Sequence, residues 1–395
     1  MKEVVIAGAA RTPIGDFLGS LKTVSLVELS KIAARSAIEK SGIPPDDVME
    51  VTTGIVFKSG VKGNPARQIQ LGLGLPTEGT AYTIDQQCAS GMKAFDLIYQ
   101  SILLGKTDAG LAVGAESMSQ TPYLLTKARE GYRLGDGPAP NDSMMIDGLI
   151  CAMMGYHMGI TAENLAEEYG VTREEQDEIA YLSHTRAAKA REAGIFTDEI
   201  APVEIVSRKG TITVSEDEHP RMDISMEELA QLKPAFKKEG GTVTAGNASG
   251  LNDAAAAIVL TSMDKADALG IKPAAKVLST ASYGVDPRIM GIGPVYAVPK
   301  AIELAGLKEE DIAYYEINEA FAAQFVACNR VLKIDMDRIN ANGSGIGLGH
   351  PVGCTGARII IALVNELKRR GERYGVASLC VGGGPSMATV IENIQ

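Results

Sequence analysis

Four short segments of the sequence carry side chains that could act together in one reaction. The first is IDQQCASGMKA, in which Cys88 follows an expected strand and precedes small residues that open a helical pattern. A thiol at a helix N-terminus meets the positive end of the helix dipole and free N–H groups, which stabilise its nucleophilic thiolate form. Cys88 is therefore a candidate nucleophile; a buried structural cysteine is the alternative.

The second segment, NGSGIGLGHPVG, contains His350. Its four glycines at alternate positions would cost too much backbone entropy in an ordinary strand, so this backbone should closely approach a ligand or another chain segment. The spacing fits neither GxGxxG nor a P-loop, which argues against a dinucleotide or a nucleoside triphosphate. His350 is a candidate base, or else a hydrogen-bonded loop residue.

The third and fourth segments are ASLCVGGGPS and EINEAFA. Cys380 closes an expected strand before a glycine turn, where open α/β sheets place their ligands, although a core cysteine would fit there too. Gly382 leaves room for a backbone N–H group that could meet an oxyanion. Asn318 lies among apolar residues, either as a site residue or as a helix cap.

An internal repeat indicates which elements position these residues. Residues 37–48 resemble residues 301–312, with five of twelve positions identical, and the helix-and-strand pattern after Cys88 returns after Cys354. Two such echoes in the same order predict a duplicated α/β unit with layered, mixed and mostly parallel sheets.

The repeat also suggests how the chain divides. The N-terminal half should span residues 1–120 plus about 246–269, and the C-terminal half residues 270–395. Residues 121–245 differ in composition and are expected to form an inserted loop domain. A strand within 246–260 should return the chain to the first half.

Composition argues against several functional classes. The formal charge of −11 disfavours nucleic acid as a partner. The longest apolar run, 254–260, is far shorter than the ~20 residues of a membrane span, and the N-terminus lacks the features of a signal peptide. We therefore expect a cytoplasmic protein. The five cysteines form no CxxC pair and the four histidines no HExxH motif, so neither a disulfide framework nor a metal site is expected.

Taken together, these segments resemble the thiolase family, and its acetyl-CoA acetyltransferases in particular, from end to end. Other matching segments are RTPIG at 11–15, NPAR at 64–67, ESMS at 116–119, HMGITAE at 157–163, GNASGLND at 246–253 and GHP at 349–351. The fold that this resemblance implies is also a duplicated α/β unit with an inserted loop domain.

The resemblance implies a role for each candidate. Cys88 would carry the acyl group, and His350 would activate Cys88 from within hydrogen-bond reach. Cys380, on the opposite side of the acetyl group, would remove or return the proton of the second acetyl-CoA. Asn318 would hold a water that forms one oxyanion hole with His350, and the N–H groups of Cys88 and Gly382 would form the other.

The resemblance also places coenzyme A mainly against the loop domain. The residues that it implies are Leu149, His157 and Met158 in the acyl and pantetheine region, Ala245 and Ser249 at the pantetheine, Arg221 near the nucleotide, and Met158, Met290 and Phe321 as walls of a short acyl pocket. Simple core packing is the alternative for Leu149 and Met158. The loop at 123–143 resembles the segment that ties two dimers into a homotetramer.

The implied activity is the reversible condensation of two acetyl-CoA molecules to acetoacetyl-CoA and CoA, or the thiolysis of a short 3-ketoacyl-CoA, without a resident cofactor. A broader-chain 3-ketoacyl-CoA thiolase and a non-catalytic acyl-CoA-binding relative are the alternatives. A decarboxylating condensing enzyme is disfavoured because Cys380 and the NEAF motif are present, and a thiol-redox protein because CxxC is lacking. Departures from the family pattern at Gln87, Ala89, Val113, 343–347 and 385–386 leave the acyl-chain preference open.

Overall fold

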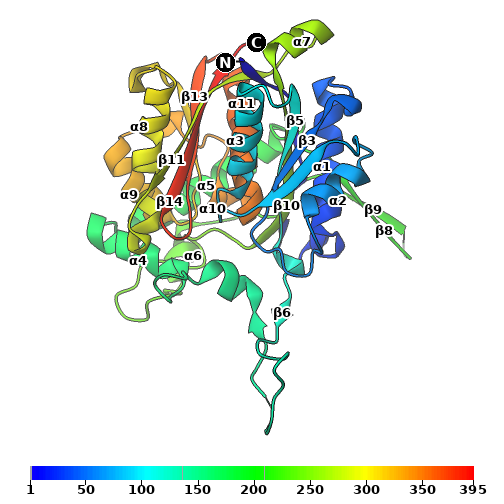
Figure 1. Ribbon diagram of the computed structural model, residues 1–395. Coiled ribbons are helices and arrows are strands. Elements are labelled where there is room, and N and C mark those ends of the chain that lie inside the picture. Colours follow the sequence, from blue (N-terminus) through cyan, green and yellow to red (C-terminus); the bar gives the residue numbers. More distant parts are fainter. Residues whose placement is uncertain (1, 136, 209) are drawn as a thin grey trace.

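The computed structural model describes residues 2–135, 137–208 and 210–395. Met1, Asp136 and Lys209 lie outside the described residues, and the last two of them fall within the expected loop domain. A ten-stranded sheet runs through the molecule, and its two ends carry separate groups of helices (Figure 1).

The strands of this sheet are β1 (Val4–Arg11), β2 (Gly15–Asp16), β3 (Glu50–Gly54), β4 (Thr80–Ile84), β5 (Ala109–Ser117), β10 (Asn252–Ser262), β11 (Ala275–Gly284), β12 (Tyr314–Ile317), β13 (Tyr374–Cys380) and β14 (Pro385–Asn393). The helices are α1 (Leu26–Ser41), α2 (Pro65–Gly72), α3 (Ser90–Leu103), α4 (Met158–Tyr169), α5 (Arg173–Glu192), α6 (Met226–Gln231), α7 (Met263–Leu269), α8 (Pro294–Leu304), α9 (Ala322–Leu332), α10 (Gly345–Leu348) and α11 (Val352–Arg370).

The strand order is β12-β13-β14-β11-β1-β10-β5-β3-β4, and β2 pairs with β10. Pairing is parallel toward the two ends, between β12 and β13 and among β5, β3 and β4. The middle strands pair antiparallel, because β10, β11 and β14 run back along their neighbours. The predicted α/β class with a mixed sheet is confirmed.

Alternate residues of the central strands face two different layers of helices, as the period of two in a strand requires. In β10, Ala254, Ala256 and Ile258 pack in one core with α3 and α11. Ala255 and Ala257, which point the other way, pack in a second core with α1. Buried side chains on both faces explain why this strand is an unbroken apolar run.

The two copies of the repeat form matching elements. Helix α1 precedes β3 as α8 precedes β12, and α3 precedes β5 as α11 precedes β13. Helices α3 and α11 pack directly against each other, and glycines make this possible. A Cβ atom on Gly91 would lie 2.8 Å from the carbonyl oxygen of Gly353, and one on Gly356 would lie 2.4 Å from the backbone nitrogen of Met92. The starts of the two helices therefore lie side by side.

The segment between the halves is built differently. It holds the short pair β6 (Tyr123–Leu124) and β7 (Asn141–Asp142), helices α4, α5 and α6, and the hairpin of β8 (Val203–Ser207) and β9 (Gly210–Val214). Strand β10 then pairs with β1 and β5 of the first half. The boundaries of the loop domain stay a prediction.

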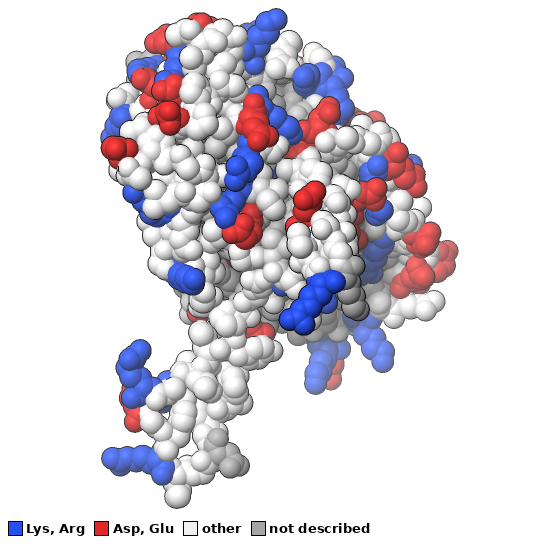
Figure 2. Space-filling view, turned by 90° about the vertical axis from the view of Figure 1, so that its right-hand side faces the viewer, with Lys and Arg blue, Asp and Glu red and all other residues white. Residues whose placement is uncertain are grey.

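The chain beyond β6 forms an arm that projects from the body of the molecule (Figures 1 and 2). Leu134 on this arm is 98% exposed, and Leu125 is exposed as well. Within the described ranges, no helix combines the length and the apolar character that a membrane crossing requires.

Candidate active site

A mainly apolar cavity of about 410 Å³ lies between the starts of α3 and α11 and the segments 144–158 and 235–251. Cys88, His350 and Gly382 line it, as do six of the seven residues predicted to bind substrate: Leu149, His157, Met158, Ala245, Ser249 and Phe321. Most other side chains of the wall are apolar, including Phe57, Met118, Met144, Leu251 and Met290. The cavity thus gathers residues from segments far apart in the sequence.

Cys88 lies in a tight turn immediately before α3. The turn is fixed by Ser90, whose hydroxyl accepts a hydrogen bond from the Gln86 N–H group (2.9 Å) and donates one to the Gln87 carbonyl (2.7 Å). Gln87 adopts a left-handed conformation with φ of 49°, which is uncommon for residues other than glycine and turns the chain sharply. Cys88 is half-buried and faces the cavity.

The thiol of Cys88 is in its protonated form at neutral pH. Burial raises the pKa of Cys88 to about 11, although the backbone N–H groups of Gly382 and of Cys88 itself act in the opposite direction. Desolvation thus outweighs the favourable N–H groups, so the position before the helix does not by itself lower the pKa of Cys88. To act as a nucleophile, Cys88 would need a base to take its proton.

His350 is that base candidate, and two side chains hold it. Its Nδ1 lies 2.7 Å from the hydroxyl of Thr355, and its backbone N–H group donates to the side-chain oxygen of Asn252 (2.9 Å). Burial, with a smaller contribution from the Arg358 cation, lowers the pKa of His350 to about 3. His350 is consequently a neutral imidazole over the physiological range.

The hydrogen bond at Nδ1 of His350 determines which ring nitrogen can accept a proton. The Thr355 hydroxyl is also 3.0 Å from the Pro351 carbonyl and donates to it, so it accepts a hydrogen bond from Nδ1–H. This arrangement leaves the lone pair on Nε2, which is buried and has no hydrogen-bond partner among the described residues. The prediction that His350 lies within hydrogen-bond reach of Cys88 is not met here. Catalytic hydrogen bonds often tighten only when substrate is bound.

Asn318 is fully buried, and neither atom of its amide has a hydrogen-bond partner in the described part of the chain. Helix α9 begins at Ala322, with Phe321 at its cap position, so Asn318 is not a helix cap. Its amide oxygen would lie 2.7 Å from a Cβ atom on residue 345, which explains the glycine at that position. An unpaired buried amide is costly, so a polar partner is expected there.

Cys380 ends β13 and is completely buried. It does not line the cavity; it packs behind the wall in one core with Met158, Met290 and Phe321. Burial raises the pKa of Cys380 well above its usual value, and the nearby Cys88 raises it further. Gly382, two residues later, does reach the cavity.

The glycine-rich segment before His350 approaches another chain segment. A Cβ atom on Gly347 would lie 2.4 Å from the carbonyl oxygen of Ser183 in α5, and one on Gly349 would lie 2.7 Å from the Asn252 side chain. Gly349 also has a φ of 99°, a conformation that favours glycine. The glycines therefore bring α10 and the His350 turn against α5 and Asn252.

Arg221 is the predicted substrate-binding residue that the structure places away from the cavity. It is exposed and lines a separate shallow hollow with Asp223, Glu228 and Leu232. Its backbone N–H group donates to Nδ1 of His184.

Sequence reasoning missed three side chains that organise the site. Thr355 and Asn252 hold His350, as described above. Buried Glu116 accepts hydrogen bonds from the N–H groups of Val56, Phe57 and Gly353, at 3.0–3.1 Å, and so ties the cavity wall to the start of α11. A hydroxyl in the first turn after the His-Pro pair was the available signal for Thr355.

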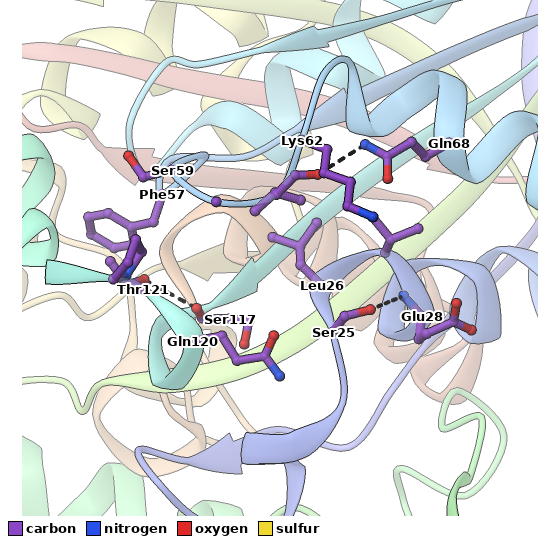
Figure 3. A pocket seen from close by; sticks show the side chains of 14 residues that line it. Ser25, Leu26, Glu28, Phe57, Ser59, Lys62, Gln68, Ser117, Gln120 and Thr121 are labelled. Atoms are coloured by element: carbon purple, nitrogen blue, oxygen red, sulfur yellow. Dashed lines mark hydrogen bonds between the residues drawn. The ribbon is translucent and has the colours of Figure 1, made fainter. Parts of the chain in front are cut away.

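A second cavity, of about 340 Å³, shares Phe57 with the first (Figure 3). Its lining mixes polar side chains, such as Ser25, Ser117 and Gln120, with apolar ones, and it holds none of the predicted site residues. Among the described residues, no group of three or more His, Cys, Asp or Glu side chains is placed to hold a metal ion.

Comparisons with known proteins show similarity over the length of the chain. The family model "Thiolase, N-terminal domain" matches residues 4–264, and "Thiolase, C-terminal domain" matches residues 271–393. The chain is 49% identical to an acetyl-CoA acetyltransferase of Syntrophomonas wolfei, over 99% of both chains, and 49% identical to one of Escherichia coli, over 100% of both.

Solved structures show the same likeness. The acetyl-CoA acetyltransferase of Syntrophomonas wolfei superposes with a TM-score of 0.97 at 50% identity, over 100% of both chains. Human mitochondrial 3-ketoacyl-CoA thiolase superposes with a TM-score of 0.96 at 40% identity, over 100% of this chain and 99% of the other. With both family models matched across nearly its whole length, the chain belongs to the thiolase family.

Proposed function

We propose that this thiolase is an acetyl-CoA C-acetyltransferase that joins two acetyl-CoA molecules to acetoacetyl-CoA and CoA, and also runs the reverse thiolysis. The carrying observation is that a thiol and a neutral imidazole with a free Nε2 line one cavity, while two backbone N–H groups are directed at the sulfur. The names of the similar enzymes from Syntrophomonas wolfei and Escherichia coli support the acetyl group as substrate.

In the first half-reaction, His350 Nε2 takes the proton of Cys88 while the sulfur attacks the thioester carbonyl. The N–H groups of Cys88 and Gly382 stabilise the oxyanion. When the C–S bond of the substrate breaks, the CoA thiolate leaves with the proton that His350 held. The product is acetyl-Cys88, and His350 is neutral again.

The second half-reaction requires Cys380 as a thiolate, which its raised pKa makes the minor form. This thiolate takes a proton from the methyl group of a second acetyl-CoA and becomes a thiol. The resulting enolate is stabilised by a water on Asn318, whose unpaired amide supports this role. His350 could complete this oxyanion hole only with a proton on Nε2, because a lone pair there cannot stabilise an oxyanion. The carbanion attacks acetyl-Cys88, the C–S bond to Cys88 breaks, and Cys380 returns its proton to the Cys88 sulfur. No resident cofactor takes part, because the CoA thioesters are the substrates.

Leu149, His157, Met158, Ala245, Ser249 and Phe321 would form the acyl and pantetheine region, because all six line the cavity. Arg221, which lies away from it, would meet the distant nucleotide end.

A broader-chain 3-ketoacyl-CoA thiolase is the second candidate, supported by the likeness to the human mitochondrial enzyme. We place the protein in the cytoplasm.

We also propose a homotetramer built as a dimer of dimers. The arm supports this assembly, because Tyr123, Leu125 and Leu134 are exposed on a segment that projects away from the core (Figure 2). Exposed apolar side chains on such a projection mark a contact with another protein surface.

The two cysteines distinguish a working thiolase from a binding protein. Labelled acetyl-CoA should label Cys88 in the wild type, no residue in Cys88→Ala, and still Cys88 in Cys380→Ala. Condensation in Cys380→Ala should fall by a factor of about 10²–10⁴, the usual contribution of general acid–base catalysis. Cys354→Ala is the matched control, because Cys354 holds the corresponding place in the second copy. Near wild-type condensation by Cys380→Ala would refute this mechanism.

A further inference from the structure

Gln87 places a carboxamide in a cavity whose walls are otherwise mostly apolar. It lines the cavity beside the nucleophile, at a position where the sequence departs from the apolar residue of the family pattern. The other polar side chains that line the cavity are those of Cys88, His350, His157 and Ser249. His157 is engaged, because its Nδ1 accepts a hydrogen bond from the Gly159 N–H group.

The direction of the Gln87 side chain is set by its backbone. The left-handed turn is held from both sides: the Gln87 N–H group donates to Asp85 (2.8 Å), and the Gln87 carbonyl accepts from Ser90. The amide oxygen lies 3.4 Å from the place that a Cβ atom on Gly382 would occupy. The amide is therefore beside the N–H group that is directed at the Cys88 sulfur.

The hydrogen-bonding capacity of this amide is largely unused within the described structure. Its nitrogen donates to the carbonyl of Asp147 at 3.3 Å, a long contact, and its oxygen accepts no hydrogen bond from any described residue. An alkyl chain packed against such an amide strips it of water without replacing the lost hydrogen bonds, which is unfavourable. A hydroxyl or carbonyl on the chain would replace them.

We propose that Gln87 is a specificity-determining residue. It favours short 3-ketoacyl-CoA substrates that carry a hydroxyl or carbonyl oxygen on the acyl chain beyond C3, over alkyl chains of the same length. This inference rests on the proposed function, since the acyl group must be carried on Cys88 to lie beside the amide. The Gln87 carboxamide thus recognises the acyl group.

The test compares thiolysis of 3-ketohexanoyl-CoA with that of its analogues carrying a hydroxyl on C4 or C5. In the wild type, kcat/KM for at least one hydroxylated substrate should exceed that for the plain chain. In Gln87→Leu this ratio should fall about 10-fold, the change that one neutral hydrogen bond gives. Gln87→Met, with an unbranched side chain of similar length, should lower the ratio in the same direction and covers the case in which Leu disturbs the turn.

Gln86→Leu is the matched control, because Gln86 is the adjacent glutamine and its side chain does not line the cavity. It should keep the wild-type ratio. Gln87→Leu and Gln87→Met must first be shown to fold and to form acyl-Cys88. If both then keep the wild-type ratio of kcat/KM between hydroxylated and plain substrates, Gln87 does not recognise the acyl chain. Failure of the proposed function would look different: the wild type itself would not cleave acetoacetyl-CoA or acquire label on Cys88.

Discussion

Replacing Thr355 with valine should slow acylation of Cys88, because the hydroxyl of Thr355 fixes which nitrogen of His350 carries the proton. Valine has nearly the same shape, so the substitution removes a hydrogen bond without opening a cavity. Thr355 and His350 are both buried, and the oxygen and Nδ1 are only 2.7 Å apart. The buried Nδ1–H group would be left without an acceptor.

The size of the effect follows from that unpaired group. An unsatisfied buried donor costs about 1–3 kcal/mol, and the need is greatest when His350 takes the thiol proton and becomes an imidazolium. At about 1.4 kcal/mol for each tenfold change in rate, a cost of this size lowers the acylation rate roughly 5- to 140-fold.

The assay is a rapid-quench measurement of acetyl-Cys88 formation from labelled acetyl-CoA. Thr355→Ser is the matched control, because it keeps the hydroxyl and loses only a methyl group; it should acylate within a few-fold of the wild type. Thermal unfolding of both variants separates a loss of fold from a loss of proton control. Acylation of folded Thr355→Val within about twofold of the wild-type rate would refute the argument.

Three further predictions follow from the same structure. Because burial raises the pKa of Cys88 to about 11, the thiolate fraction is small at pH 7 and grows as the pH rises. Inactivation by iodoacetamide should therefore accelerate from pH 7 to 10, and a plateau below pH 8 would show that the thiolate is already formed. Thiolysis should favour acetoacetyl-CoA over unsubstituted longer chains, since Met158, Met290 and Phe321 form walls of the cavity. In a long pocket each added methylene would instead contribute about 0.8 kcal/mol of binding free energy, and a rise in kcat/KM through eight or more carbons would contradict the short pocket. Leu134→Asp, on the exposed arm, should weaken the tetramer to dimers in light scattering, whereas Leu304→Asp, at an exposed leucine of α8, should not; a wild type with the mass of one chain, 41.6 kDa, would exclude the assembly.

The family and the fold class could be predicted because the repeat and the spaced motifs survive in the sequence itself. A helix that ends before a strand repeats whether or not its partners are known, so α1 with β3 and α8 with β12 were recognisable. The antiparallel pairing of β11 with β14 was not, because it depends on contacts between residues about a hundred positions apart. Local patterns contain no record of such pairing.

The candidate site shows a similar division. Cys88, His350 and Gly382 were found by their motifs and do line one cavity. The raised pKa of the Cys88 thiol could not be predicted, because burial is a property of the whole fold and outweighs the local helix terminus. Asn252 escaped notice because only the folded chain brings it to His350, 98 positions away, whereas Thr355 had a local signal in its hydroxyl just after the His-Pro pair.

The close contact of α3 with α11 has a consequence for how this protein can evolve. Cys88 and His350, two of the proposed reacting residues, lie just before the starts of these two helices, which are separated by little more than backbone, so the spacing of the two residues tolerates almost no change. Much of the wall that meets the acyl chain comes from other segments, 144–158 and 235–251. Substitutions in those segments can change which substrates are accepted while the geometry of the reacting residues is inherited intact. The scaffold therefore conserves the reaction and lets the substrate specificity vary.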